Sequence, residues 1–187
     1  MPHLLFVCVA NRARSPLAQL IAQERLGAHP QGHEITVASA GVWTAGDEPM
    51  WPPAAAAARA LTLDPAPFRS RQITSAIVAD SELVLAATRT IRDGVVAANP
   101  KARDRVLTWR ELAWVFSQVA PDWQGLPLAQ RPQRLPAFVS HYRSRITWPP
   151  GEQLDVQDPA GAPSRVMAEA SALTLSAVDL VVAGLCA

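Results

Sequence analysis

Cysteine is scarce in this chain, and histidine shows no pattern. Only two cysteines occur among the 187 residues, Cys8 and Cys186, and they lie near opposite ends of the sequence. This number excludes a disulfide framework and a zinc site built on closely spaced cysteines. The histidines also lack the spacing of metal ligands; they are His3, His29, His33 and His141. We therefore expect no metal site.

Excess charge and a targeting segment are also missing. The formal net charge is +1, so no strong field favours nucleic acid or an anionic membrane as partner. The N-terminus lacks the basic region of a signal peptide. The apolar stretch Ala170–Ala187 is interrupted by Ser171, Thr174 and Asp179, which predicts a packed amphipathic helix rather than a membrane span. We expect a cytoplasmic protein, in which a free cysteine stays reduced.

The chain does contain an alternation of apolar strand-like runs and helical patterns. Length and composition (49% hydrophobic, 18% charged) indicate one globular domain over residues 1–187. Strands are predicted at about 2–7, 34–40, 83–87 and 105–108. Helices are predicted at about 15–26, 53–63, 74–79, 89–99, 109–119, 134–146 and 164–185. This order predicts a three-layer, doubly wound α/β fold, with a four-stranded parallel sheet and helices on both faces. A longer Pro-rich segment at about 120–157 is expected to border a cleft.

The stretch from Cys8 to Ser15, Cys-Val-Ala-Asn-Arg-Ala-Arg-Ser, carries the chemistry. It lies between the first predicted strand and the first predicted helix, where unpaired backbone N–H groups form an anion site. The helix dipole and Arg14 would stabilise a Cys8 thiolate, which is the nucleophilic form. Arg14 also offers a fork of N–H donors that matches phosphate oxygens. We hypothesise that the loop binds a phosphoryl group and that Cys8 attacks it.

Each residue of this stretch also has a simpler interpretation. Cys8 could be a small buried apolar residue, and Ser15 could cap the helix instead of donating to a thiolate. Asn11 suits a left-handed backbone position. Arg14 is harder to explain, because a cation in the first helical turn opposes the helix dipole unless an anion compensates. The loop has no Gly-Lys-Ser/Thr sequence, so it is not an ATP-binding Walker motif.

A phosphatase reaction at a cysteine also needs a general acid for the leaving oxygen. Two Asp-Pro dipeptides are candidates, Asp64-Pro65 and Asp158-Pro159. Either of them could instead be a simple turn, the common role of Asp-Pro. The residues alone leave this choice open.

Several ordered motifs resemble the low-molecular-weight protein tyrosine phosphatases. The resemblance covers most of the chain and is weakest across 113–155. Its motifs are Val7–Pro16, Ser39-Ala40-Gly41, Ser70-Arg71-Gln72-Ile73, Ser81–Leu85 with Thr88, and Asp158-Pro159. The resemblance implies a phosphotyrosine protein or a small phosphomonoester as substrate, and it implies no cofactor. We expect a monomer, with a weak dimer as the alternative.

Carried over by position, the resemblance gives each residue a role. Cys8 would be the nucleophile that forms a cysteinyl-phosphate, and Arg14 would hold the phosphoryl oxygens. Asp158, rather than Asp64, would protonate the leaving group and then activate water. Ser15 would assist the thiolate, and Asn11, with support from Ser39, would hold the shape of the loop. The substrate's phosphate would lie against Val9, Ala10, Asn11, Arg12, Ala13 and Ser15.

Some positions depart from the pattern that this family usually has. Ala10 stands in place of glycine, and Ala13 in place of a second cysteine that could trap oxidised Cys8 as a disulfide. Arg12 occupies a usually apolar position, which would favour acidic substrates. Ala160 and Gly161 replace aromatic residues after Asp-Pro. These changes leave the substrate less defined than the reaction. Trp43 and Trp51 are candidates for an aromatic wall or for core packing.

Three other functions compete with a protein tyrosine phosphatase. One is a thiol-dependent arsenate reductase of the same fold, although its disulfide relay needs more cysteines than Cys186 supplies. The second is a phosphatase that acts on a non-protein substrate. The third is a non-catalytic phosphate-binding protein, which the combination of Cys8, Arg14 and Asp158 disfavours.

Overall fold

The sheet has four parallel strands in the order β2-β1-β3-β4. This arrangement comes from a computed structural model, which describes residues 3–187. The strands are β1 (Leu4–Cys8), β2 (Val37–Gly41), β3 (Leu83–Ala86) and β4 (Val106–Thr108). Every residue of β1, β3 and β4 is buried, as expected for parallel strands covered on both faces. The predicted α/β fold with a four-stranded parallel sheet is confirmed.

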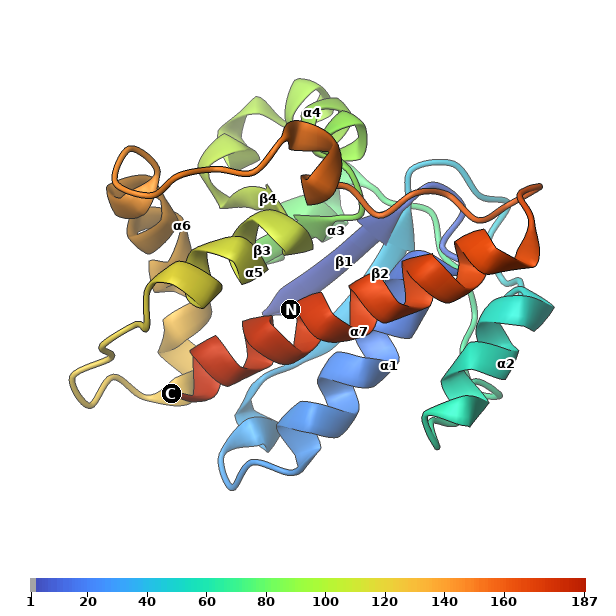
Figure 1. Cartoon of the computed structure of the whole chain (residues 1–187), viewed down its shortest axis with the longest axis horizontal. Coiled ribbons are helices and arrows are strands. Elements are labelled where there is room, and N and C mark those ends of the chain that lie inside the picture. The colour runs from blue at the N-terminus through green and yellow to red at the C-terminus, as the bar shows by residue number, and fades with distance from the viewer. Residues whose placement is uncertain (1–2) are drawn as a thin grey trace.

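Helices cover both faces of the sheet (Figure 1). The chain moves from β1 to β2 in one direction and from β3 to β4 in the other. Right-handed crossovers therefore place α1 and α4 on opposite faces. Helices α1, α5 and α7 pack together on one face, while α4 and α6 contact β3 or β4 on the other. The helices are α1 (Arg14–Gly27), α2 (Pro52–Ala60), α3 (Ser75–Ala79), α4 (Arg89–Ala98), α5 (Trp109–Gln118), α6 (Arg131–Tyr142) and α7 (Ser164–Cys186).

Three predicted elements differ from the structure by three residues or more at one end, and one of them is the helix predicted at 53–63, which forms at Pro52–Ala60. The second strand was predicted to start at 34, but Gly32–Glu34 is a short 3-10 helix and β2 begins at Val37. A Cβ on Gly32 would overlap the carbonyl of Leu26, so this turn stays folded against the end of α1. The helix predicted at 134–146 forms instead at Arg131–Tyr142, starting beside Pro132, which suits a first helical turn. Pro2, in the predicted first strand, lies outside the described residues.

Helix α7 is long and apolar enough to cross a membrane by length and composition, with a mean hydropathy of 1.7. In the fold, however, it packs against α1 and α5. The side chains of Ala177, Val178, Val181 and Leu185 are buried there. The predicted packed helix is thus observed, and its apolar composition is explained by this packing.

The segment that precedes α7 crosses the carboxyl ends of the strands (Figure 1, orange). The Val156 N–H donates to the carbonyl of Ala87, the residue after β3, at 2.8 Å. The same edge of the sheet carries the loop that joins β1 to α1. The fold therefore brings the two segments together at the place where parallel sheets bind ligands.

Candidate active site

Cys8 ends β1, and its sulfur is nearly enclosed. The residue is only 2% exposed, and its Sγ accepts a hydrogen bond from the Ser15 hydroxyl at 3.0 Å. Ser15 lies inside α1, which follows Ala13 and has no side-chain cap. Ser15 is therefore not the helix cap, and it takes the other position considered above, as a donor to Cys8. The uncapped first turn leaves backbone N–H groups for an anion.

Asn11 holds the loop through three hydrogen bonds. Its φ of 52° is in the left-handed region, as predicted, and asparagine tolerates this conformation. Its side-chain N–H groups donate to the hydroxyls of Ser15 at 2.9 Å and Ser39 at 2.8 Å. Its Oδ1 accepts from the backbone N–H of Arg71 at 2.9 Å. The loop is thus tied to β2 and to the segment after α2.

These bonds fix the direction of the hydroxyl groups. Ser39 accepts from Asn11 and donates to Gln19 Oε1 at 2.6 Å. Ser15 likewise accepts from Asn11, so its single O–H remains free to donate to Cys8. The alternative acceptor, the carbonyl of Ala40, is farther away at 3.5 Å. The sulfur is therefore a hydrogen-bond acceptor in this arrangement.

Arg14 is a buried guanidinium, and its Nε nitrogen has no partner in the described part of the chain. It is 3% exposed, and it donates to the carbonyl of Val156 at 2.9 Å and to a carboxylate oxygen of Asp158. Its Nε is buried and has no hydrogen-bond partner within residues 3–187. A buried donor left unpaired costs about 1–3 kcal/mol. An oxyanion beside Arg14 would remove this cost.

Asp158, and not Asp64, lies at this site. The second oxygen of Asp158 accepts from the Ala160 N–H at 3.1 Å, and the side chain is 42% exposed. Asp64 lies in an exposed turn after α2, where it accepts from the Ala66 N–H at 3.0 Å. Asp64 therefore has the structural role expected of an Asp-Pro turn. A half-exposed acid beside Arg14 can exchange a proton with a substrate or with water.

The side chain of Arg12 lies at the rim of the loop. It pairs with Glu48 Oε1 at 3.0 Å and donates to the Pro49 carbonyl, and it is one-third exposed. Trp43 is 78% exposed, and its backbone N–H donates to the carbonyl of Val9. Trp51 is partly buried and packs against the hydrophobic core. Trp43 is thus the better candidate for an aromatic wall, and Trp51 is a packing residue.

Ala10 and Gly41 show where the loop needs a small residue. Ala10 does not have a positive φ, so alanine in place of the family's usual glycine adds no backbone strain. Gly41, at the end of β2, lies directly against the loop. A Cβ there would come within 2.6 Å of the Val9 carbonyl oxygen and 2.9 Å of the Asn11 nitrogen. Because Gly41 has no Cβ, the backbone of the loop can lie directly against it.

We therefore expect Gly41→Ala to displace the loop from Cys8 to Ser15. The added methyl group meets backbone atoms, which cannot move aside without shifting the loop, so overpacking should cost about 1–3 kcal/mol of stability. Any reaction that depends on this loop should slow by about 10²-fold, since a 1 Å misplacement has that effect. Gly94→Ala is the matched control, because its Cβ meets no atom within 4 Å. Full activity of Gly41→Ala would contradict this account of the loop.

Sequence reasoning gave no role to three residues that support this site. Gln19 and Gly41 are described above, and the Arg71 side chain also donates to the carbonyl of Ser39 at 2.7 Å. Burial lowers the pKa of the Arg71 guanidinium, although arginine stays charged. Arg71 belongs to the motif Ser70-Arg71-Gln72-Ile73. Its contacts form only because the fold brings this motif against Asn11 and Ser39, which are distant in the sequence. Within residues 3–187, no three His, Cys, Asp or Glu side chains are grouped to hold a metal ion.

Comparisons with known proteins agree with this fold. The family model described as low molecular weight phosphotyrosine protein phosphatase matches residues 3–120. A low molecular weight protein tyrosine phosphatase from T. tengcongensis has a TM-score of 0.70 at 22% identity, with 98% of this chain and 99% of that chain covered. The YwlE arginine phosphatase from Geobacillus stearothermophilus has a TM-score of 0.68 at 22% identity, with 96% and 90% covered.

A third similar structure is the tyrosine phosphatase amsI from Erwinia amylovora. Its TM-score is 0.68 at 18% identity, and the match covers 98% of this chain and 93% of that chain. At these identities the structures show a shared fold. A comparison with curated protein sequences finds no match.

Proposed function

Because this chain belongs to the low molecular weight phosphotyrosine protein phosphatase family, we propose that it hydrolyses phosphomonoesters through Cys8 and that its substrates are aryl phosphates such as phosphotyrosine. One observation carries the proposal. The same loop holds a sulfur that accepts a hydrogen bond from Ser15 and a buried Arg14 with an unpaired N–H. A nucleophile and an oxyanion donor therefore meet at one helix N-terminus.

In the first step, the Cys8 thiolate attacks phosphorus and the P–O bond to the leaving group breaks. Arg14 and the loop N–H groups hold the non-bridging oxygens, where charge develops. These oxygens take over the Arg14 donors that Asp158 occupies in the free protein. A carboxylate beside the substrate dianion is favoured to take a proton. Asp158 then gives this proton to the departing phenolate oxygen.

In the second step, water hydrolyses the cysteinyl-phosphate. Asp158, now a carboxylate, takes a proton from water while the water oxygen attacks phosphorus. The S–P bond breaks, and the electron pair returns to sulfur, which the Ser15 hydroxyl stabilises as thiolate. Inorganic phosphate leaves, and Asp158 can pair with Arg14 again.

The rim of the loop supports an aryl phosphate over a phosphoarginine. The Arg12 guanidinium lies beside the loop and is one-third exposed. A second guanidinium, on the substrate, would meet like charge there, although Glu48 partly neutralises Arg12. A neutral aromatic ring would meet no such repulsion and could contact the exposed Trp43. Acidic residues flanking a phosphotyrosine would be attracted to Arg12.

Hydrolysis of phenyl phosphate by four proteins tests this proposal. Wild type should turn over, and Asp158→Ala should lose about 10²–10⁴-fold in rate because it lacks the general acid. Asp64→Ala is the matched control and should keep the wild-type rate, because Asp64 lies in an exposed turn. Cys8→Ser should be inactive.

Other outcomes of this experiment would overturn the proposal or part of it. An inactive wild type, or an active Cys8→Ser, would refute the cysteine mechanism. A large loss of activity in Asp64→Ala, with a wild-type rate in Asp158→Ala, would show that Asp64 is the general acid. Faster hydrolysis of phosphoarginine than of phosphotyrosine would refute the substrate class.

The arsenate reductase alternative finds little support in the position of Cys186. This residue ends the 23-residue helix α7, roughly 35 Å along that helix from the end nearest Asp158. Burial raises the pKa of the Cys186 thiol, against a smaller opposing effect of Arg131. A protonated and distant thiol is a poor partner for Cys8. Arsenate-dependent consumption of an external thiol would favour this alternative.

A further inference from the structure

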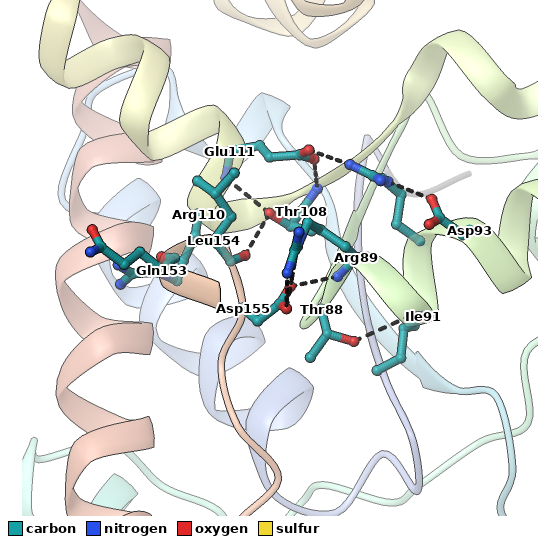
Figure 2. A network of polar contacts seen from close by, with 11 residues as sticks. Thr88, Arg89, Ile91, Asp93, Thr108, Arg110, Glu111, Gln153, Leu154 and Asp155 are labelled. Atoms are coloured by element: carbon teal, nitrogen blue, oxygen red, sulfur yellow. Dashed lines mark hydrogen bonds and ion pairs between the residues drawn. The ribbon is translucent and has the colours of Figure 1, made fainter. Parts of the chain in front are cut away.

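Five residues that precede α7 form a segment which we name the strap, Leu154–Asp158. At one end, Val156 and Asp158 bond to Arg14 in the active site. At the other end, Leu154 and Asp155 bond to groups that have no part in the chemistry proposed above (Figure 2). The position of Asp158 therefore depends on how the other end of the strap is held.

Asp155 binds the N-terminus of α4. Its Oδ1 accepts from the backbone N–H of Arg89, the first residue of that helix, at 2.7 Å. Its Oδ2 also pairs with the Arg89 guanidinium at 3.1 Å. The helix cap is Thr88, which accepts from the Ile91 N–H. Asp155 thus satisfies a different first-turn donor, where a negative charge is stabilised by the helix dipole.

Leu154 is held by a hydroxyl whose direction is fixed. The Thr108 hydroxyl donates to the Leu154 carbonyl at 3.0 Å and accepts from the Glu111 N–H at 2.9 Å. The Glu111 carboxylate in turn accepts from the Thr108 N–H at 2.7 Å (Figure 2). It also pairs with Arg92. The Thr108 hydroxyl thus uses its O–H for Leu154 and its oxygen for Glu111. These bonds anchor this end of the strap to the end of β4.

The short distance along the chain couples the anchor to the acid. Asp155 and Asp158 are three residues apart, at most roughly 10 Å of extended chain. Between them, Val156 is fully buried and its N–H donates to the Ala87 carbonyl at 2.8 Å. A chain segment held by contacts at both ends has little freedom to move. Loss of the Asp155 contacts would therefore shift the Val156 carbonyl and Asp158.

We propose that Asp155 is a positioning residue that, by binding the N-terminus of α4, sets where Asp158 stands relative to Cys8 and Arg14. This inference rests on the proposed function, since it concerns the acid of that reaction. Proton transfer requires the acid within hydrogen-bond reach of the leaving oxygen. Loss of Asp155 therefore impairs the proton transfer more than it impairs the attack by Cys8.

The leaving group separates these two effects. Phenolate is a strong base, with an ordinary pKa of about 10 for its conjugate acid, and it needs a proton as it leaves. Nitrophenolate is a weaker base and leaves with little help. We compare kcat/KM for phenyl phosphate and 4-nitrophenyl phosphate, because this constant reports the step that forms the cysteinyl-phosphate.

Asp155→Ala should lower kcat/KM by about tenfold or more for phenyl phosphate, and by less than about threefold for 4-nitrophenyl phosphate. Asp155→Asn keeps an acceptor for the Arg89 N–H and should recover part of this loss. Glu152→Ala is the matched control. It removes an exposed carboxylate from the short 3-10 helix Gly151–Leu154 that leads into the strap, and Glu152 has no side-chain hydrogen bond among the described residues. The control should leave the ratio of the two constants unchanged.

A double-mutant cycle gives the second readout. In the Asp158→Ala background the acid is already absent, so Asp155→Ala should change neither constant further. Equal losses for both substrates, or the same loss in the Asp158→Ala background, would show a merely structural role and overturn the inference. Absence of turnover by wild type would instead overturn the proposed function. If Asp155→Ala does not fold, the ratio measured for Asp155→Asn decides alone.

Discussion

Replacement of Cys8 by serine is expected to lower the turnover of phenyl phosphate by at least about 10⁴-fold, because the chain then lacks its nucleophile. A serine hydroxyl at this position is not ionised, and the nearby Ser15 can stabilise a thiolate but is no strong base. The structure should barely change, since the two side chains are similar in size. Turnover, thermal unfolding and phosphate binding are measured together.

The matched control is Cys186→Ser, which alters the other cysteine. Cys186 lies at the end of α7, far along the chain and the helix from the loop. This variant should keep the wild-type rate. Equal loss of activity in Cys186→Ser would show that the two cysteines act together, as in a disulfide relay, and would contradict a mechanism that depends on Cys8 alone.

Replacement of Arg14 by lysine is expected to lower kcat/KM by about 10³-fold, although the charge is kept. The guanidinium has N–H groups for the Val156 carbonyl and, besides these, N–H groups that pair with Asp158 in the free protein or with an incoming anion. A lysine ammonium is a compact charge on a flexible chain and cannot reproduce this fork. The buried Val156 carbonyl would also lose its Arg14 donor. Steady-state kinetics and inhibition by inorganic phosphate measure the two effects.

Arg25→Lys serves as the control for this substitution on the same helix. Arg25 is half-exposed and pairs with Glu24 and Asp179 at the far end of α1. Exposed pairs of this kind contribute about 0–1 kcal/mol to stability. Kinetics of Arg25→Lys should match wild type. An Arg14→Lys variant that is equally active would contradict the role of the guanidinium fork.

Local patterns were enough to predict most of the fold. Parallel strands are buried on both faces, so Leu4–Val7 and Leu83–Ala86 appear as short continuous apolar runs. The start of β2 was predicted too early, because β-branched Ile35 and Thr36 favour a strand while Gly32 keeps the chain folded against Leu26. That contact joins residues of two elements, which no local pattern reveals.

The site also contains residues that the local sequence predicts and residues whose position depends on the tertiary fold. Cys8, Asn11 and Arg14 share one strand–loop–helix unit, so their proximity follows from the local sequence. Asp158 lies 144 positions after Arg14, and only the family resemblance distinguished it from Asp64. Asp155 is still harder to find, because its contact with Arg89 depends on how the strap crosses the sheet. An aspartate in a proline-rich loop gives no signal of its own.

The most direct test of the central claim is to isolate the phosphorylated enzyme. Asp158→Ala is mixed briefly with excess 4-nitrophenyl phosphate and quenched, and the peptide that contains Cys8 is analysed by mass spectrometry. The leaving group departs with little help, while water lacks its general base, so the intermediate should accumulate. The account predicts one phosphoryl group on Cys8 and a burst of one equivalent of nitrophenol. Continued turnover with Cys8 unmodified, or a phosphoryl group on another residue, would contradict it.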